Sequence, residues 1–204
     1  MKLLHIDSSP LTNNSTSRVL SAAIVTQLQA TYDIQSVIYR DVGLTPPPHL
    51  TEAVFNAMRD GVETCAPDVR QAVEEANQAI EELKMCDVLV IGAPMFNHSI
   101  VTNLKSWIDQ VCQAGKTFAF SSAGALGLIS DKPVFIASTR GGIYADDVHR
   151  AMDFQEPYLV SALSLMGLKN VKIIRAEGVD KTAPGRAAAQ QAALQMIKTQ
   201  VFIE

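Results

Sequence analysis

Cysteine is scarce in this sequence. Only three cysteines occur among 204 residues, and Cys65, Cys86 and Cys112 are odd in number and widely spaced. Such a set predicts neither a disulfide framework nor a zinc site, and neither His49 nor His149 has sequence neighbours that suggest a metal. We therefore expect no metal centre and a reduced, cytoplasmic protein.

Excess charge of one sign and long apolar runs are also missing. Lys and Arg number 17 against 21 Asp and Glu, which gives a formal net charge of −4. A chain without a basic surplus has no electrostatic footprint for nucleic acid or for an anionic membrane surface. No apolar stretch approaches the roughly 18 residues of a membrane-spanning helix, and Asp7 comes too early for a signal-peptide core. We expect neither nucleic acid nor membrane as a partner.

The two best-known glycine-rich phosphate motifs are absent as well. No GxxxxGK[ST] occurs, so a nucleoside triphosphate loop is excluded, and the absence of GxGxxG argues against a dinucleotide fingerprint. The composition is 48% hydrophobic and 19% charged, which is ordinary for a globular protein. The length fits one domain over residues 1–204.

Apolar runs typical of strands alternate with patterns typical of helices along the whole chain. The sequence predicts strands at 3–6, 34–39, 87–92, 134–138 and 171–175, and helices at 16–31, within 50–84 (one or two), from 104 onward, near 154–166 and at 184–201. Residues 115–130 read as an irregular excursion or a short hairpin. Five strands alternating with helices predict a doubly wound parallel α/β sheet with helices on both faces, and favour the flavodoxin-like order 2-1-3-4-5.

The loop after the first predicted strand is rich in hydroxyl groups. It runs from Asp7 to Arg18 and includes Ser9, Ser15, Thr16 and Ser17 at the start of a predicted helix. Hydroxyls and free N–H groups at a helix N-terminus favour an anion, and such a loop can hold a single terminal phosphate. The alternative is an ordinary solvated N-cap loop, because these residue types are favoured there anyway.

Two more unusual loops follow the third and fourth predicted strands. Pro94–Ser99 offers an aromatic ring, an amide and an imidazole, and Thr139–Gly142 contains a glycine pair that permits close approach to a flat ligand. The alternatives are a plain turn in which Asn97 caps the next helix, and a flexible turn with Arg140 as a solvated charge. Because ligands bind at the carboxyl edge of an open parallel sheet, the three loops together predict a pocket.

The chain resembles the FMN-dependent NADH-azoreductases, a family of quinone reductases with a flavodoxin-like fold, over nearly its whole length. The residues that carry the resemblance are Ser9 with Ser15–Arg18, Ala93–Asn97 with Leu104–Lys105, Thr139–Gly142, and Ala176–Gly178. The resemblance implies a homodimer with one FMN per subunit near the subunit interface. By position, it implies phosphate contacts from Ser9, Ser15, Thr16 and Ser17, ring contacts from Met95, Phe96, Asn97 and His98, and an approach to the polar edge of the ring by Thr139, Arg140, Gly141 and Gly142.

The activity that the resemblance implies is a two-electron transfer on the flavin. NADH gives a hydride, and quinones or aromatic azo compounds then accept the electrons at the same face in a ping-pong mechanism, with no side-chain nucleophile. The sequence departs from the family pattern at Phe96, His98 and Phe120, where family members have Tyr, another aromatic and an active-site Tyr. These departures concern the substrate range more than the cofactor, and we expect His98 and Phe120 to be substrate contacts.

Two alternatives stay open on the sequence. A flavodoxin-type electron carrier would also bind FMN, although the long segments 42–67 and 116–130 supply pocket walls that a carrier does not need. NADPH could replace NADH if Arg140 or Arg59 met its 2′-phosphate. The physiological electron acceptor has no signature in the sequence.

Overall fold

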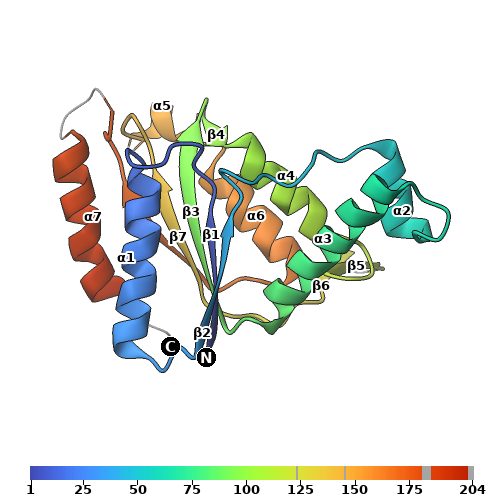
Figure 1. Cartoon of the computed structure of the whole chain (residues 1–204). Helices are drawn as coiled ribbons and strands as arrows, with labels where there is room; N and C mark the ends of the chain where they lie inside the picture. Colours follow the sequence, from blue (N-terminus) through green and yellow to red (C-terminus); the bar gives the residue numbers. More distant parts are fainter. Residues whose placement is uncertain (123, 145, 181–184, 202–204) are drawn as a thin grey trace.

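A parallel sheet runs through the middle of the computed structural model, which describes residues 1–122, 124–144, 146–180 and 185–201 (Figure 1). Its strands are β1 (Lys2–Asp7), β2 (Ser36–Asp41), β3 (Val88–Phe96), β7 (Val134–Thr139) and β8 (Val171–Ala176), in the order β2-β1-β3-β7-β8. All four pairings along this path are parallel. The predicted flavodoxin-like order is confirmed.

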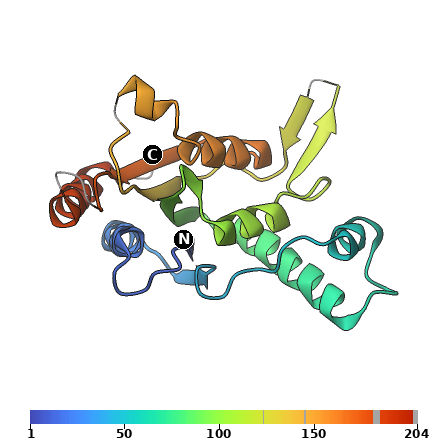
Figure 2. The same cartoon turned by 90° about the horizontal axis from the view of Figure 1, so that it is seen from above.

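Helices cover both faces of the sheet (Figure 2). On one face lie α1 (Thr16–Thr31) and α7 (Arg186–Gln200), and on the other lie α3 (Pro67–Met85), α4 (Thr102–Val111) and α6 (Glu156–Met166). A further helix, α2 (Glu52–Asp60), packs on α3, and α5 (Asp147–Arg150) is a single turn. Among the described residues no helix has both the length and the apolar character needed to cross a membrane.

The central strand β3 is buried from both sides. Val88 and Val90 pack in the cluster that includes α1 and α7, whereas Leu89 and Ile91 pack in the cluster that includes α3, α4 and α6. Successive strand residues point to opposite faces, so a strand covered by helices on both faces needs an unbroken apolar run. The run at 88–91 therefore places this strand in the centre of the sheet and its carboxyl end at the middle of one edge.

Several predicted boundaries need correction. The second strand runs over Ser36–Asp41 and not 34–39, because its partner β1 spans Lys2–Asp7 and offers a ladder only over that length. The third strand continues beyond residue 92 to Phe96, since Gly92–Pro94 still pair with Ala137–Thr139 of β7.

The remaining predicted elements are found close to their expected places. The excursion at 115–130 contains a hairpin of β5 (Phe118–Ser121) and β6 (Gly124–Gly127). The single turn of α5 was not predicted, and two helices occupy the segment 50–84. Residue 184, the expected start of the last helix, lies outside the described residues.

Candidate functional site

A cavity of about 300 Å³ lies at the carboxyl edge of the sheet, beside the ends of β1, β3 and β7. The three predicted loops and the start of α7 contribute to its wall. Its lining residues are Ser9, Leu11, Asn14, Ser15, Thr16, Pro94, Met95, Phe96, Thr139, Gly141, Val179, Asp180 and Arg186. We call it the strand-end cavity. The prediction that the three loops form one pocket is confirmed by this wall.

Three hydroxyl side chains, Ser15, Thr16 and Ser17, are buried at the N-terminus of α1. Ser15 is the N-cap, and its Oγ accepts a hydrogen bond from the Arg18 N–H at 3.4 Å and lies 3.1 Å from the Ser17 Oγ. The Ser9 Oγ accepts from the Leu11 N–H at 3.2 Å. Ser15 does cap the helix and residues 10–14 are exposed, as the alternative proposed, but Ser9, Ser15 and Ser17 are themselves at most 4% exposed. Buried hydroxyls at the positive end of a 16-residue helix are suited to an anion.

The second loop is a tight turn between β3 and a short antiparallel strand, β4 (Ser99–Ile100). Asn97 and His98 occupy the turn with φ of 48° and 68°, a left-handed conformation that favours glycine. The alternative in which Asn97 caps the next helix is wrong, because α4 begins at Thr102 without a side-chain cap. The turn instead projects Asn97 beside a groove of about 410 Å³ that adjoins the strand-end cavity at Phe96.

His98 is joined to the third loop by a tyrosine that the sequence analysis missed. The Tyr144 hydroxyl lies 3.1 Å from Nδ1 of His98, and the two rings meet edge to face at 6.1 Å. The guanidinium carbon of Arg140 lies 5.3 Å from the centre of the Tyr144 ring. Tyr144 follows the glycine pair by two residues, so its place in the strand-end loop was the available signal.

Arg140 is a buried charge and not a solvated one. Its side chain is 3% exposed and forms ion pairs with Asp153 at 2.7 Å, Glu156 at 2.5 Å and Glu177 at 3.4 Å. A guanidinium that already faces three carboxylates does not attract a further phosphate, so the interpretation of Arg140 as a contact for the 2′-phosphate of NADPH is wrong. The residue ties the third loop to the start of α6 and the end of β8.

Seven of the twelve predicted cofactor-binding residues line the strand-end cavity. They are Ser9, Ser15, Thr16, Met95, Phe96, Thr139 and Gly141. Asn97 lines the adjoining groove, while Ser17, His98, Arg140 and Gly142 are neighbours of lining residues without lining the cavity themselves. Phe120 lies elsewhere, on the β5–β6 hairpin, which extends away from α1 and α7 (Figure 2), and is 78% exposed.

The sequence analysis also missed a cation at the cavity. Arg186, the first residue of α7, donates from Nη1 to the Asn14 carbonyl at 3.2 Å and from Nε to the Val179 carbonyl at 3.3 Å. Asp180 lines the same wall, and a Cβ added at Gly141 would lie 3.3 Å from its Cβ. The rule that ligands bind at strand carboxyl ends also applies to the loop after β8. The residue types in that loop, however, did not indicate a binding site in the sequence.

A second, larger cavity of about 660 Å³ lies between α2 and the segment after α4. Its wall includes Phe55, Arg59, Cys112 and Phe118. Arg59 is paired with Asp60 at 2.6 Å at an exposed position. The two cavities have no lining residue in common, so within one chain Arg59 is not part of the strand-end cavity.

Two of the three cysteines, Cys86 and Cys112, are largely shielded from solvent. Burial raises the pKa of the Cys86 thiol, and burial raises that of Cys112 to about 11, so both are protonated at neutral pH and are weak nucleophiles. Within the described ranges, no group of three or more His, Cys, Asp or Glu side chains is arranged to hold a metal ion.

Comparison with known sequences identifies a family and close relatives. The family profile described as flavodoxin-like fold matches residues 1–201. An FMN-dependent NADH:quinone oxidoreductase from Laribacter hongkongensis (strain HLHK9) is 42% identical over 202 residues, which are 98% of this chain and 100% of that relative. A protein of the same name from Sinorhizobium medicae (strain WSM419) is 46% identical over 180 residues, 88% of this chain and 87% of that relative.

Solved structures share the architecture at lower identity. Azoreductase AzrA has a TM-score of 0.88 and 21% identity, with 98% of this chain and 99% of that chain covered. An FMN-dependent NADH-azoreductase from Bacillus anthracis str. Ames Ancestor, solved in complex with FMN, has a TM-score of 0.87 and 21% identity, with 98% and 97% covered. These neighbours are similar to this chain in fold.

Proposed function

Because the chain belongs to the flavodoxin-like family of FMN-dependent NADH:quinone oxidoreductases, we propose that it binds FMN in the strand-end cavity and passes electrons from NADH to quinones. The observation that carries the proposal is that one cavity joins a hydroxyl-lined helix N-terminus to a strand end with an aromatic and a thioether side chain. FMN supplies the two-electron redox chemistry when bound, and the protein supplies binding and orientation.

The residues at one end of the cavity fit a phosphate group. Ser9, Ser15 and Thr16 present hydroxyls beside the first turn of α1, where the helix dipole favours negative charge. Arg186 adds a positive charge at the same wall. Each hydrogen bond to a charged phosphate contributes about 1.5–3 kcal/mol to binding. FMN, which ends in a phosphate, fits this donor set better than riboflavin, which does not.

The other end of the cavity fits a flat, partly apolar ring. Met95 and Phe96 provide apolar surface, and Phe96 also borders the adjoining groove that Asn97 lines. The Asn97 amide and the N–H groups of Gly141 and Gly142 are the donors that we propose for the polar edge of the ring, where they would stabilise negative charge. His98 and Phe120 remain proposed substrate contacts.

Measurement of NADH turnover distinguishes this proposal from the alternative, a flavodoxin-type electron carrier. Purified protein that retains FMN should be yellow and should consume NADH when a quinone is added, without a separate reductase. Aromatic azo dyes are proposed as a second class of acceptor, supported by the fold shared with azoreductases. Protein that is yellow but consumes NADH only with an added reductase would be a carrier.

We also propose a ping-pong mechanism, because NADH and the acceptor would use the same mouth of the strand-end cavity in turn. Initial rates measured against NADH at several quinone concentrations should give parallel double-reciprocal lines. High quinone should inhibit competitively against NADH. Intersecting lines would mean that both substrates are bound at the same time and do not share one place.

A homodimer is the proposed assembly. The resemblance to the family is what supports it, and Phe55, Phe120 and Phe154, at 56%, 78% and 61% exposed, are accessible to a partner subunit. Phe154 lies next to the His98 turn, since its N–H donates to the His98 carbonyl at 2.9 Å. The proposed location is the cytoplasm, which is supported by three cysteines without disulfides.

A further inference from the structure

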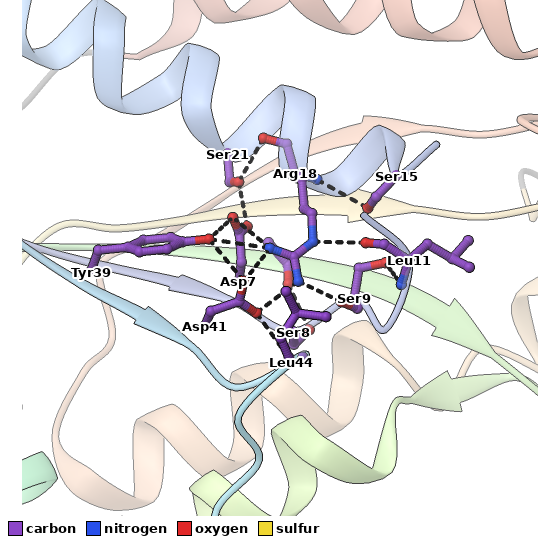
Figure 3. Close-up of polar contacts among 12 residues, drawn as sticks. Asp7, Ser8, Ser9, Leu11, Ser15, Arg18, Ser21, Tyr39, Asp41 and Leu44 are labelled. Atoms are coloured by element: carbon purple, nitrogen blue, oxygen red, sulfur yellow. Dashed lines mark hydrogen bonds and ion pairs between the residues drawn. The ribbon is translucent and has the colours of Figure 1, made fainter. Parts of the chain in front are cut away.

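A cluster of charged and polar side chains, buried at Asp7 and partly exposed at its other members, lies directly behind the hydroxyl-rich loop (Figure 3). It consists of Asp7 at the end of β1, Arg18 in the first turn of α1, and Tyr39 and Asp41 near the end of β2. The side chains of Asp7, Arg18 and Asp41 are 5%, 14% and 19% exposed. We call these four residues the charge cluster. It therefore joins three elements at the edge of the sheet where the strand-end cavity opens.

Arg18 binds Asp41 through both of its terminal nitrogens. Nη1 donates to Oδ2 of Asp41 at 2.6 Å, and Nη2 donates to Oδ1 at 2.7 Å (Figure 3). This two-pronged geometry fixes the plane of the guanidinium, which a lysine ammonium cannot do. The Leu44 N–H donates to Asp41 Oδ1 at 3.0 Å and holds the carboxylate from its other side.

The remaining donors of Arg18 hold backbone carbonyls of the loop. Nε donates to the Leu11 carbonyl at 2.8 Å, and Nη2 donates to the Ser9 carbonyl at 2.7 Å. Nη1 also donates to the Tyr39 hydroxyl at 3.2 Å. A guanidinium has five N–H groups, and these contacts, together with the two to Asp41, provide an acceptor for each. No donor of Arg18 is therefore left for a ligand.

Asp7 and its neighbours fix the back of the cluster. The Tyr39 hydroxyl donates a hydrogen bond to Asp7 Oδ2 at 3.0 Å, and the Ser21 Oγ donates to Asp7 Oδ1 at 2.7 Å. A Cβ at Gly43 would lie 2.1 Å from the Ser9 carbonyl oxygen, so the chain after β2 packs tightly against the same loop. The loop is thus held from two sides, by Arg18 and by Gly43.

The charge balance of the cluster argues against a direct role in attracting an anion. One guanidinium faces two carboxylates, Asp7 at 3.6 Å and Asp41 at 2.6 Å. A phosphate near such a group gains no net attraction from it. An arginine beside a phosphate-type loop suggests a phosphate ligand at first sight, but here its geometry and its partners indicate a different role.

We propose that Arg18, fixed by Asp41, is a positioning residue for the loop that binds the FMN phosphate. It holds the Ser9 and Leu11 carbonyls on the guanidinium, away from the anion, and so leaves hydroxyl and N–H donors to form the phosphate site. Both residues line the strand-end cavity, so a turned carbonyl there would place an acceptor against the phosphate. This inference rests on the proposed function.

The Asp41→Asn substitution distinguishes a positioning role from simple electrostatics, because the two predict opposite changes in FMN affinity. If charge alone mattered, removal of a carboxylate near the phosphate would tighten FMN binding. If positioning matters, the loss of the two-pronged partner releases Arg18 and weakens FMN binding. Arg18→Lys gives the second test, because it keeps the charge and loses the geometry.

The experiment measures the binding of FMN and of riboflavin to the apo-protein by quenching of flavin fluorescence. Riboflavin lacks the phosphate and reports on the rest of the site. We expect both variants to lower the ratio of FMN to riboflavin affinity by about tenfold or more. The matched control is Glu81→Gln, which removes a carboxylate from an exposed pair with Lys84 on α3.

The outcomes separate this inference from the proposed function. Wild-type protein that prefers FMN, with the preference unchanged or increased in Asp41→Asn and unchanged in Arg18→Lys, contradicts the positioning role alone. Equal losses for both flavins also contradict it, because they indicate a general disturbance. If either variant fails to fold, Tyr39→Phe removes only the hydroxyl between Arg18 and Asp7, and should lower the same ratio by a smaller factor. Wild-type protein that shows no preference for FMN contradicts the proposed phosphate site as well.

Discussion

Two non-glycine residues with positive φ occupy the turn beside the strand-end cavity. Asn97 and His98 lie at φ of 48° and 68°, where a Cβ costs about 1–2 kcal/mol per residue. Asparagine and histidine both occur there more often than most residues, but each still has the Cβ that glycine lacks. The imidazole of His98 contacts the Tyr144 hydroxyl, at the edge of the sheet where we propose that the electron acceptor binds.

The strain at His98 can be measured by comparing two variants that both lack the imidazole. We expect His98→Gly to be more stable than His98→Ala by about 1 kcal/mol, because only alanine keeps a Cβ at positive φ. Chemical denaturation gives the two free energies of unfolding. The same pair of substitutions at Glu74, an exposed position inside α3, should show the opposite order, since glycine weakens a helix. Equal stabilities at His98 would show that the turn is not strained.

Ser15 combines two roles at the residue scale, as N-cap of α1 and as part of the cavity wall. We expect replacement of Ser15 and Ser17 together by Ala to weaken FMN binding by about 1–3 kcal/mol per lost bond to the phosphate. Riboflavin binding should change little. Ser15→Thr is the control, because threonine keeps a capping hydroxyl. Full FMN affinity in the double Ala variant would show that the phosphate lies elsewhere.

At the scale of elements, the edge strand β2 is held by more than its ladder to β1. Asp41 at its end binds Arg18 of α1, so the pair connects the strand to a helix on one face of the sheet. Burial raises the pKa of Asp41, but the hydrogen bonds from Arg18 and the Leu44 N–H, with the positive charge of Arg18, outweigh burial and hold that pKa below its usual 3.8.

The lowered pKa of Asp41 predicts how the stabilisation by the Arg18–Asp41 pair depends on pH. A carboxyl whose pKa is lower in the folded state stabilises the fold above its unfolded-state pKa, and the contribution is lost as the pH falls through the folded-state pKa. We expect Asp41→Asn to lower the free energy of unfolding by a constant amount above about pH 5, and by progressively less below about pH 4. Urea unfolding between about pH 2 and pH 7 measures the difference. If the loss in free energy of unfolding were the same at about pH 2 as at pH 7, the Asp41 carboxylate would not be its source.

At the scale of the whole molecule, one chain leaves two separate cavities and several exposed phenylalanines. The strand-end cavity and the larger cavity near Phe55 have no wall in common. Phe120, which the family resemblance implies as a substrate contact, stands on a hairpin away from the strand-end cavity. In the proposed homodimer a second copy of the chain would bring such surfaces together, whereas within one chain Phe120 stays away from the strand-end cavity.

We therefore expect sedimentation at micromolar concentration to give about twice the mass of one 204-residue chain. Phe120→Ala should then lower turnover with quinone while FMN stays bound, and Glu74→Ala on exposed α3 should leave turnover unchanged. A monomer with full activity would contradict the proposed homodimer, and the position of Phe120 would then be incidental.

The sequence by itself determined the architecture and the place of the strand-end cavity. Alternating apolar runs and helical stripes predict a parallel sheet with helices on both faces, and the connections of such a sheet place all strand carboxyl ends at one edge. The loops after β1, β3 and β7 therefore had to meet, and the strand-end cavity is where they do. Strand ends were predicted less well, because a strand extends only as far as its partner does, as β2 and β3 show.

The tertiary structure alone decided where the charged side chains point. Arg18 binds a carboxylate 23 residues away, Arg140 binds one 37 residues away, and Arg186 binds a carbonyl 172 residues away. The sequence suggested a solvated Arg140 or a phosphate contact, and the structure shows a buried ion-pair partner. Apolar burial is periodic and so leaves a local pattern in the sequence. An ion pair between distant segments leaves none, because it forms only where the folded chain brings opposite charges together.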